Sequence, residues 1–228
     1  SLLTEFGCGA TFPITTATLA RSNGVVEKYQ GQNIEFAVHG YYHKDHTKMP
    51  FSQQLEQFLA ARRVFEERGI HCQGFRSPYL RSNPEMLTAV KQAGFLYDSS
   101  QALAWDIPDV FENAGYRRAL DFYGAVSASD YPALPRWDND LVRIPYCLPD
   151  DEAFVDRFQM SATGMTELWL DILKRTYDHG ELFTVALHPE RVVLCQLALI
   201  QVLQEAHMMK PRVWMTQLHH IAAWWKAR

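Results

Sequence analysis

Residues 84–98, PEMLTAVKQAGFLYD, show the pattern that decides the predicted fold. Asn83 and Pro84 are typical of the start of a helix, and Gly94 is typical of its left-handed exit. The short apolar segment after Gly94 suits a buried parallel strand, and it ends on the polar Asp98. The stretch therefore predicts a helix that is followed by a strand with a polar residue at its end.

The same order of amphipathic segment, glycine, apolar segment and polar residue occurs elsewhere in the chain. Helices are predicted over residues 18–30, 51–68 and 165–179, each followed by glycine and a short apolar segment. Helices that alternate with such strands indicate an α/β protein with a parallel sheet or barrel. The predicted strands lead to His39, Arg76, Asp98 and His188. Because sites form at the carboxyl ends of parallel strands, these four residues are the first candidates for a functional site.

The composition is that of an ordinary globular chain. Of its 228 residues 47% are hydrophobic, and the net charge is −4. A negative net charge argues against a broad nucleic-acid interface, which needs a basic face. No apolar run approaches the ~20 residues that span a membrane. The four cysteines are far apart, so we expect neither a disulfide framework nor a zinc knuckle, and unpaired thiols favour the cytoplasm.

We expect a single domain over residues 1–228. The alternation of helices and strands fails between residues 101 and 150, where five of the eleven prolines lie. Only residues 141–144 resemble a strand there, so we expect a region of irregular loops that carries substrate contacts. Beyond it, helices are predicted over residues 192–209 and 216–226, with a short strand over residues 213–215.

His39 and His43 are the candidate metal ligands. They lie four residues apart in the segment HGYYH, so on a helical turn both imidazoles face the same way. This spacing suits zinc or a similar ion, and two surface histidines in a turn are the alternative. Gly40 stands where a metalloprotease has its general-base glutamate, so the segment is not that motif. We expect Asp45 and His46 to be solvated or to support the ligands.

The other strand ends supply groups for catalysis. Arg76 offers a rigid fork for a carboxylate, and Pro78 fixes a turn that would aim the amide of Tyr79 into the site. A carboxylate such as Asp98 beside the imidazole of His188 would make a general acid or base. Each residue also has a structural alternative. Arg76 could form an Arg–Asp pair, Tyr79 could be a core tyrosine, and Asp98 could cap a turn. No serine or cysteine lies in a known nucleophile motif, so metal-activated water is the simplest nucleophile.

Several segments together resemble the polysaccharide deacetylase family, which is the NodB-homology group or carbohydrate esterase family 4. They are residues 9–15 (GATFPIT), 39–43 (HGYYH), 75–79 (FRSPY), 95–100 (FLYDSS), 141–149, 185–188 (VALH) and 221–228 (IAAWWKAR). The resemblance covers nearly the whole chain in the family's order. It implies a distorted, incomplete (β/α) barrel and a metal-dependent hydrolase that removes acetyl groups from N-acetylated sugars or polysaccharides.

The resemblance also implies roles around the metal and the oxyanion. His39 and His43 would be metal ligands, and the metal would be divalent, most simply zinc. Arg76 would match the arginine that orients the catalytic carboxylate. Tyr79 would match the residue whose backbone amide helps to hold the oxyanion, which agrees with the general chemistry of acyl transfer.

Further implied roles concern the leaving group and the substrate. Asp98 would correspond to the acid that tunes the last histidine of the family, and His188 would be the general acid that protonates the leaving amine. Leu187 would line the acetyl pocket. An acetylated carbohydrate is the expected partner, and Trp105, with Tyr131 and Trp137, could contact its sugar rings.

One family motif is absent from the sequence. The family's first strand carries two adjacent Asp residues, a general base and the third metal ligand, and it precedes the helix before GATF. The chain begins at Ser1 without methionine, so we expect an N-terminally truncated domain without this strand. Otherwise Asp45 or Asp98 completes the metal site, or activity is lost. Two alternatives are an amidohydrolase of the same fold for a small cyclic or ureido amide, and a non-catalytic glycan-binding relative.

Overall fold

The computed structural model describes residues 2–22 and 24–228, so Ser1 and Asn23 lie outside the described part. The chain forms two compact units. The sheet unit comprises Gly7–Gln101, Pro135–Ile144 and Met215–Arg228. The helical unit comprises Ser1–Phe6, Ala102–Leu134 and Pro145–Trp214. Each unit is described by itself.

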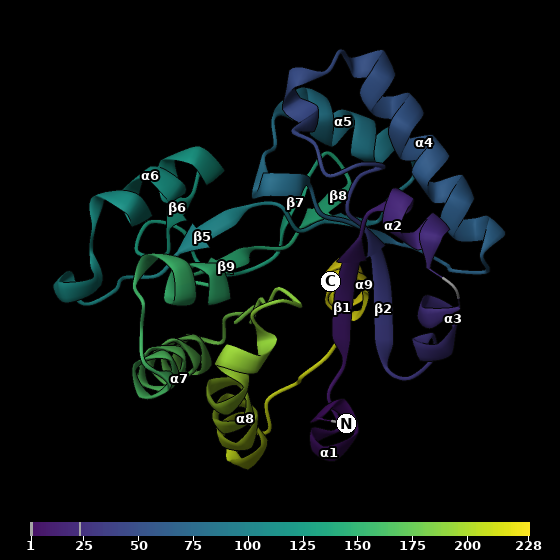
Figure 1. Ribbon diagram of the computed structural model, residues 1–228. Coiled ribbons are helices and arrows are strands. Elements are labelled where there is room, and N and C mark those ends of the chain that lie inside the picture. The colour runs from purple at the N-terminus through teal and green to yellow at the C-terminus, as the bar shows by residue number, and fades with distance from the viewer. Residues whose placement is uncertain (1, 23) are drawn as a thin grey trace. The chain divides into compact units, whose positions relative to one another are not determined.

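The sheet unit is built on a six-stranded sheet with the order β1-β2-β3-β4-β8-β7 (Figure 1). The strands are β1 (Ala10–Ile14), β2 (Ile34–Val38), β3 (Gly74–Phe75), β4 (Tyr97–Asp98), β7 (Arg136–Asp138) and β8 (Leu141–Arg143). Strands β1 to β4 and β8 are parallel, and β7 is antiparallel to β8. In the described residues the sheet stays open, as expected for an incomplete barrel.

Helices cover this sheet and form the core with it. They are α2 (Thr16–Arg21), α3 (Val25–Tyr29), α4 (Phe51–Glu67), α5 (Pro84–Gln92) and α9 (Leu218–Lys226), with short 3-10 turns η1 (His46–Lys48) and η2 (Pro78–Leu80). Fully buried Phe58 and Phe65 of α4 pack with Phe75 of β3 and with Met86 and Val90 of α5. These residues recur at helical spacing, so each helix turns one apolar stripe to the sheet.

The predicted ends of α5 are confirmed by their hydrogen bonds. The Asn83 side chain accepts a bond from the Met86 backbone N–H at 2.8 Å, and Pro84 occupies the first turn. Gly94 has φ 85°, the left-handed exit that glycine adopts without strain. The single helix predicted over residues 18–30 is instead two helices, α2 and α3, because Gly24 with φ 75° begins a new helix.

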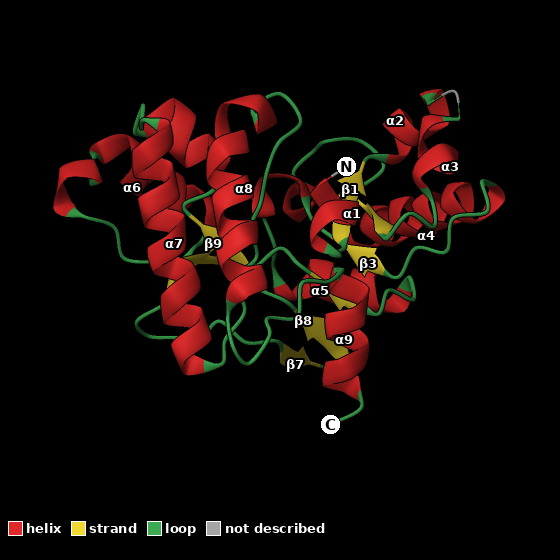
Figure 2. Cartoon of the chain, turned by 90° about the horizontal axis from the view of Figure 1, so that it is seen from below, coloured by secondary structure: helices red, strands yellow, loops and turns green. Residues whose placement is uncertain are grey.

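The helical unit holds a small parallel sheet with the order β6-β5-β9. Its strands are β5 (Ala102–Ala104), β6 (Val126–Ser127) and β9 (Tyr146–Leu148). Its α-helices are α1 (Leu2–Phe6), α6 (Ala114–Tyr123), α7 (Ala162–His179) and α8 (Val192–Met208), with the 3-10 helix η3 (Asp109–Phe111) and the π-helix η4 (Ala153–Arg157). Helices α7 and α8 pack side by side in both views (Figures 1 and 2). No helix in the described part of the chain is long and apolar enough to cross a membrane.

Three sequence expectations about regular structure are wrong. Residues 101–150 are not irregular throughout, because they include α6 and five short strands. Strands of two or three residues are too short to show a period in the sequence. Residues 182–187 and 213–215 do not form strands. The first of these segments is held by separate hydrogen bonds, from Leu182 N to Ala133 O and from the Thr184 hydroxyl to Pro145 O.

Candidate functional site

The parallel strands of the sheet unit end in one row. The register pairs Val38 with Phe75, Phe75 with Asp98, and Asp98 with Arg143. We call the edge where these strands end the carboxyl edge. His39 and Arg76 directly follow β2 and β3, and Asp98 is the last residue of β4. Three of the four predicted strand ends therefore lie along this edge, and His188 belongs to the helical unit.

His39 and His43 lie together at the carboxyl edge. Their ring centroids are 5.0 Å apart, and Nδ1 of His39 is 2.8 Å from the backbone oxygen of Arg76. A carbonyl oxygen can only accept, so Nδ1 carries the proton and Nε2 carries the lone pair. Histidine ligands of metals are held in this way, by a hydrogen bond from the other ring nitrogen. The two imidazoles thus fit the nitrogen ligands of zinc.

The loop between these histidines closes over a third one. Gly40 has φ 75°, and a Cβ atom there would lie 2.5 Å from Cε1 of His46. His46 is fully buried, with Phe58 and Phe75 packed around its ring. Burial lowers the pKa of His46 to about 4, so the ring is neutral at pH 7. The expectation that His46 is solvated is therefore wrong, because it is a core residue beneath the loop.

Tyr79 lies on a strained turn beside the histidines. Its φ is 58° and that of Leu80 is 55°, a left-handed conformation that non-glycine residues rarely adopt. The Tyr79 ring meets the His43 ring edge to face at 4.5 Å and is 42% exposed. Strain of about 1–3 kcal/mol for each such residue persists where the surroundings impose it, and it is concentrated at functional sites.

Asp98 holds this turn from below. It is fully buried, and its carboxylate accepts hydrogen bonds from Arg143 Nε at 2.7 Å and from the Ser100 hydroxyl at 2.6 Å. The Ser100 oxygen in turn accepts a bond from the backbone N–H of Ser77 at 2.8 Å. Arg76 is fixed to the same loop, since it donates to both the backbone and the side-chain oxygen of Ser99. Asp98 therefore positions the Ser77–Tyr79 segment, as in the alternative in which it caps the Ser99–Ser100 turn.

In the helical unit His188 is hydrogen-bonded to Asp151 instead of Asp98. Nδ1 of His188 is 2.7 Å from Asp151 Oδ1, and the His188 backbone N–H donates to Oδ2 at 2.5 Å. Asp151 is fully buried, whereas the His188 side chain is 45% exposed. The hydrogen bond to Asp151 raises the pKa of His188. Sequence reasoning missed Asp151, although the adjacent acids Asp150 and Asp151 after a buried strand were a visible signal.

Asp150 completes a buried network behind this pair. Its carboxylate accepts hydrogen bonds from the Tyr146 hydroxyl at 2.6 Å and from the Ala153 backbone N–H at 3.0 Å. Burial raises the pKa of Asp150. All four oxygens of Asp150 and Asp151 thus have protein donors, so hydrogen bonding alone accounts for the cluster.

The metal-binding capacity of the described residues is divided between two places. One place is formed by Asp150, Asp151 and His188, whose possible ligand atoms all lie within 4.8 Å of one another. No carboxylate in the described part of the chain forms such a group with His39 and His43, so neither Asp45 nor Asp98 completes that site. The two histidines therefore fit a metal as two of the three protein ligands that a catalytic zinc needs.

The expected substrate contacts in the helical unit differ in exposure. Leu187 is half-buried, and Trp105 is only 8% exposed. A ring that stacks on sugar must present a face, so Trp105 offers little area. Tyr131 is 47% exposed in the helical unit, and Trp137 is 48% exposed in the sheet unit.

Residues 1–97 match the sequence model of the polysaccharide deacetylase family. The chain is polysaccharide deacetylase-like. The resemblance predicted from the motifs is thereby confirmed over these residues. A search of curated proteins finds no match for this deacetylase-like chain.

Solved structures agree in fold. A Mycobacterium smegmatis protein described as a polysaccharide deacetylase matches with TM-score 0.75 and 22% identity, over 99% of this chain and 74% of that one. A Pseudomonas aeruginosa PAO1 protein of the same description matches with TM-score 0.76 and 21% identity, over 100% and 71%. The PuuE allantoinase matches with TM-score 0.75 and 22% identity, over 99% and 70%. These similarities establish the polysaccharide deacetylase fold for the deacetylase-like chain.

Proposed function

We propose that this protein is a metal-dependent hydrolase that removes acetyl groups from N-acetylated sugars or polysaccharides. The observation that carries the proposal is the hydrogen bond from His39 Nδ1 to the Arg76 carbonyl at 2.8 Å, with the His43 ring 5.0 Å away. It leaves the lone pair of His39 on Nε2, next to a second imidazole, at the carboxyl edge of a parallel sheet. A divalent metal bound there, most simply zinc, would polarise the acetyl carbonyl and activate water.

The residues of the chain supply the remaining steps. Tyr79 lies in the strained turn, and its backbone amide would donate to the developing oxyanion. His188 would give its proton to the leaving nitrogen, and the buried Asp151 carboxylate keeps that imidazole oriented and favours its protonated form. Leu187 and Trp105 are proposed to contact the substrate, and Arg76 is proposed to orient the catalytic carboxylate.

Metal content tests the metal site directly. Elemental analysis of the chain and of the His39→Ala/His43→Ala variant should give near one equivalent of zinc in the first and almost none in the second. The same zinc content in both would refute these ligands. No zinc in either would mean that the two histidines need a further ligand, and the metal-dependent mechanism would not apply to the chain as given.

Turnover tests the proton donor separately from the metal. On N-acetylated oligosaccharides, His188→Ala should lose about 10²–10⁴-fold in kcat, the contribution of a positioned general acid, with unchanged zinc content. Gln196→Ala, an exposed position on α8, is the matched control. Unchanged turnover in His188→Ala would remove the proposed role.

A small cyclic or ureido amide is the second candidate substrate. The observation that favours it is the fold match to the PuuE allantoinase, which is as similar as the matches to the deacetylase-like proteins. Parallel assays with allantoin and with N-acetylglucosamine oligomers separate the two. Turnover of allantoin alone would replace the carbohydrate proposal.

A further inference from the structure

The loops at the carboxyl edge carry an excess of positive charge, although the whole chain has a net charge of −4. Residues 39–50, 76–83 and 99–101 follow β2, β3 and β4. Their cations are Lys44, Lys48, Arg76 and Arg81, and their only carboxylate is Asp45. Asp45 is shared, with Lys48 at 3.9 Å and Arg81 at 3.8 Å.

A fifth cation, Arg136, joins this edge from the antiparallel strand β7. The register places Arg136 directly opposite Arg143, and like charges opposite each other destabilise a strand pair. Arg143 is neutralised by Asp98 at 2.7 Å, but among the described residues no carboxylate lies within 4 Å of the Arg136 guanidinium. Arg136 therefore has no carboxylate partner among the described residues, whereas the facing Arg143 has two, Asp98 and also Asp138 at 3.5 Å.

Neutral groups hold two of these guanidinium groups in place. Arg136 donates to the side-chain oxygen of Gln101 at 2.7 Å. Arg76 donates to the backbone oxygen of Ser99 at 3.0 Å and to its hydroxyl at 2.8 Å. The short loop after β4 thus holds one arginine from β3 and another from β7, and the neutral Gln101 side chain orients Arg136 without cancelling its charge. Oriented guanidinium forks of this kind suit planar carboxylates.

The cations at the carboxyl edge form a long row. Strands β2, β3, β4, β8 and β7 are neighbours, so the row from the loop after β2 to β7 extends over about 19 Å at ~4.8 Å per strand. Lys44 lies at the β2 end, with its ammonium group 5.7 Å from the centre of the Tyr42 ring, and that ring is 50% exposed. A single small carboxylic acid cannot reach both Lys44 and Arg136, whereas a chain of sugars can.

We infer that the carboxyl edge of the sheet unit binds a polyanionic glycan, with Arg136 and Lys44 as contacts for its acidic groups. The inference rests on the proposed function, because it names the substrate class of that site as an acidic acetylated polysaccharide. Its acidic groups can be carboxylates or sulfates, which share the charge that the edge recognises. Fixed charges on the substrate would speed its approach and set its position across the strand ends.

The test is binding by calorimetry, without turnover. The probes are a galacturonic acid tetramer, a sulfated tetramer and a neutral N-acetylglucosamine tetramer. At low salt an acidic tetramer should bind about ten-fold more tightly than the neutral one, and the difference should shrink between about 50 and 300 mM salt. The carboxylated and sulfated probes distinguish the two acidic groups.

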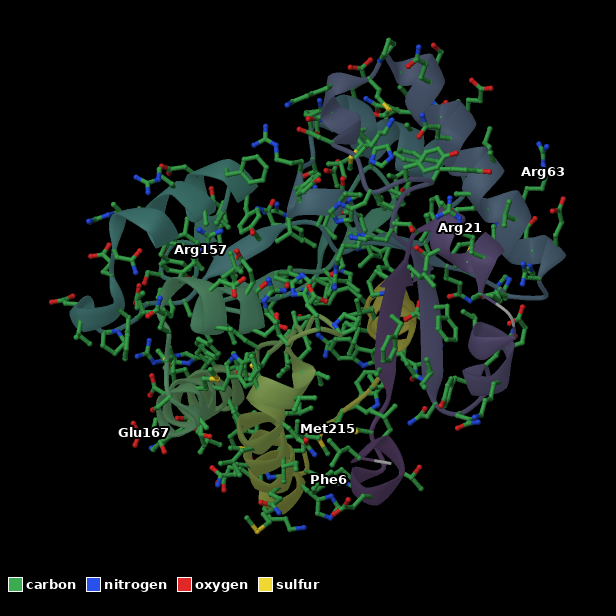
Figure 3. The ribbon with its side chains drawn as sticks, viewed as in Figure 1. Phe6, Arg21, Arg63, Arg157, Glu167 and Met215 are labelled. Atoms are coloured by element: carbon green, nitrogen blue, oxygen red, sulfur yellow. The ribbon has the colours of Figure 1, made fainter. Side chains whose placement is uncertain are left out.

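Arg136→Gln and Lys44→Gln should each weaken binding of the acidic tetramer about three-fold, as for a partly exposed ion pair, and leave the neutral one unchanged. The matched control is Arg63→Gln, which removes an exposed charge on α4 that points into solvent (Figure 3). Helix α4 begins at Phe51, directly after the loop that follows β2. At 1.5 Å per residue, Arg63 lies about 18 Å along the helix from Phe51.

Two results would overturn the inference: equal affinity for acidic and neutral tetramers, or an equal loss in Arg63→Gln. Tighter binding of a single-stranded oligonucleotide of the same charge would also overturn it, in favour of a nucleic-acid partner. Selective binding of the acidic tetramer, together with no release of acetate from the N-acetylglucosamine tetramer, would support the inference and count against the proposed function instead.

Discussion

Asp98→Asn should destabilise the sheet unit by about 3 kcal/mol. Asp98 is fully buried and Arg143 is 4% exposed, so the variant leaves the guanidinium without its carboxylate at 2.7 Å. Breaking a buried ion pair by removing one partner typically destabilises by about 3–5 kcal/mol. The lower end applies here because Asp138 stays 3.5 Å from Arg143 and because asparagine keeps one acceptor oxygen.

Urea unfolding followed by circular dichroism measures this loss. With a denaturant slope of about 2 kcal/mol per M, a loss of 3 kcal/mol lowers the midpoint by about 1.5 M. The control is Asp138→Asn, which removes the partly exposed partner of the same arginine and should lower stability by less than about 1 kcal/mol.

A double variant separates the charge from the packing. Asp98→Asn/Arg143→Met removes both charges and should regain much of the loss, because a buried apolar pair avoids the desolvation of an unpaired ion. A loss below about 1 kcal/mol in the single variant, or a double variant that is less stable than Asp98→Asn, would refute the reasoning.

Three further changes test the remaining geometry. Asp151→Asn should lower the raised pKa of His188, so the alkaline limb of kcat/KM moves to lower pH; an unmoved limb would contradict the pairing. His46 has a folded-state pKa of about 4 against 6.5, so stability should fall by up to about 3 kcal/mol as the pH drops from 6.5 to 4. His46→Phe should remove that dependence in urea unfolding at the two pH values. Gly40→Ala places a Cβ 2.5 Å from His46 and should reduce zinc content and thermal stability, and full retention of both would refute the close approach.

Local signals in the sequence predicted much of the fold. The cap of α5 by Asn83, the left-handed Gly94 and the apolar stripes of α4 and α5 depend on residues within one or two turns of each other. The strand ends at His39, Arg76 and Asp98 followed from the same alternation. The HGYYH spacing and the ordered motifs identified the family resemblance that the comparison confirmed.

Contacts between distant parts of the chain decided the rest. Asp151 bonds His188 across 37 residues, and Arg143 bonds Asp98 across 45, so no local pattern could choose between Asp98 and Asp151 as the partner of His188. His46 is polar and sits in a polar loop, and only the fold buries it against Phe58 and Phe75. The sequence by itself determined which chemical groups are present and that His39, Arg76 and Asp98 stand at strand ends. Tertiary structure decided their hydrogen-bond partners, because burial and pairing depend on which segments pack together after the chain has folded.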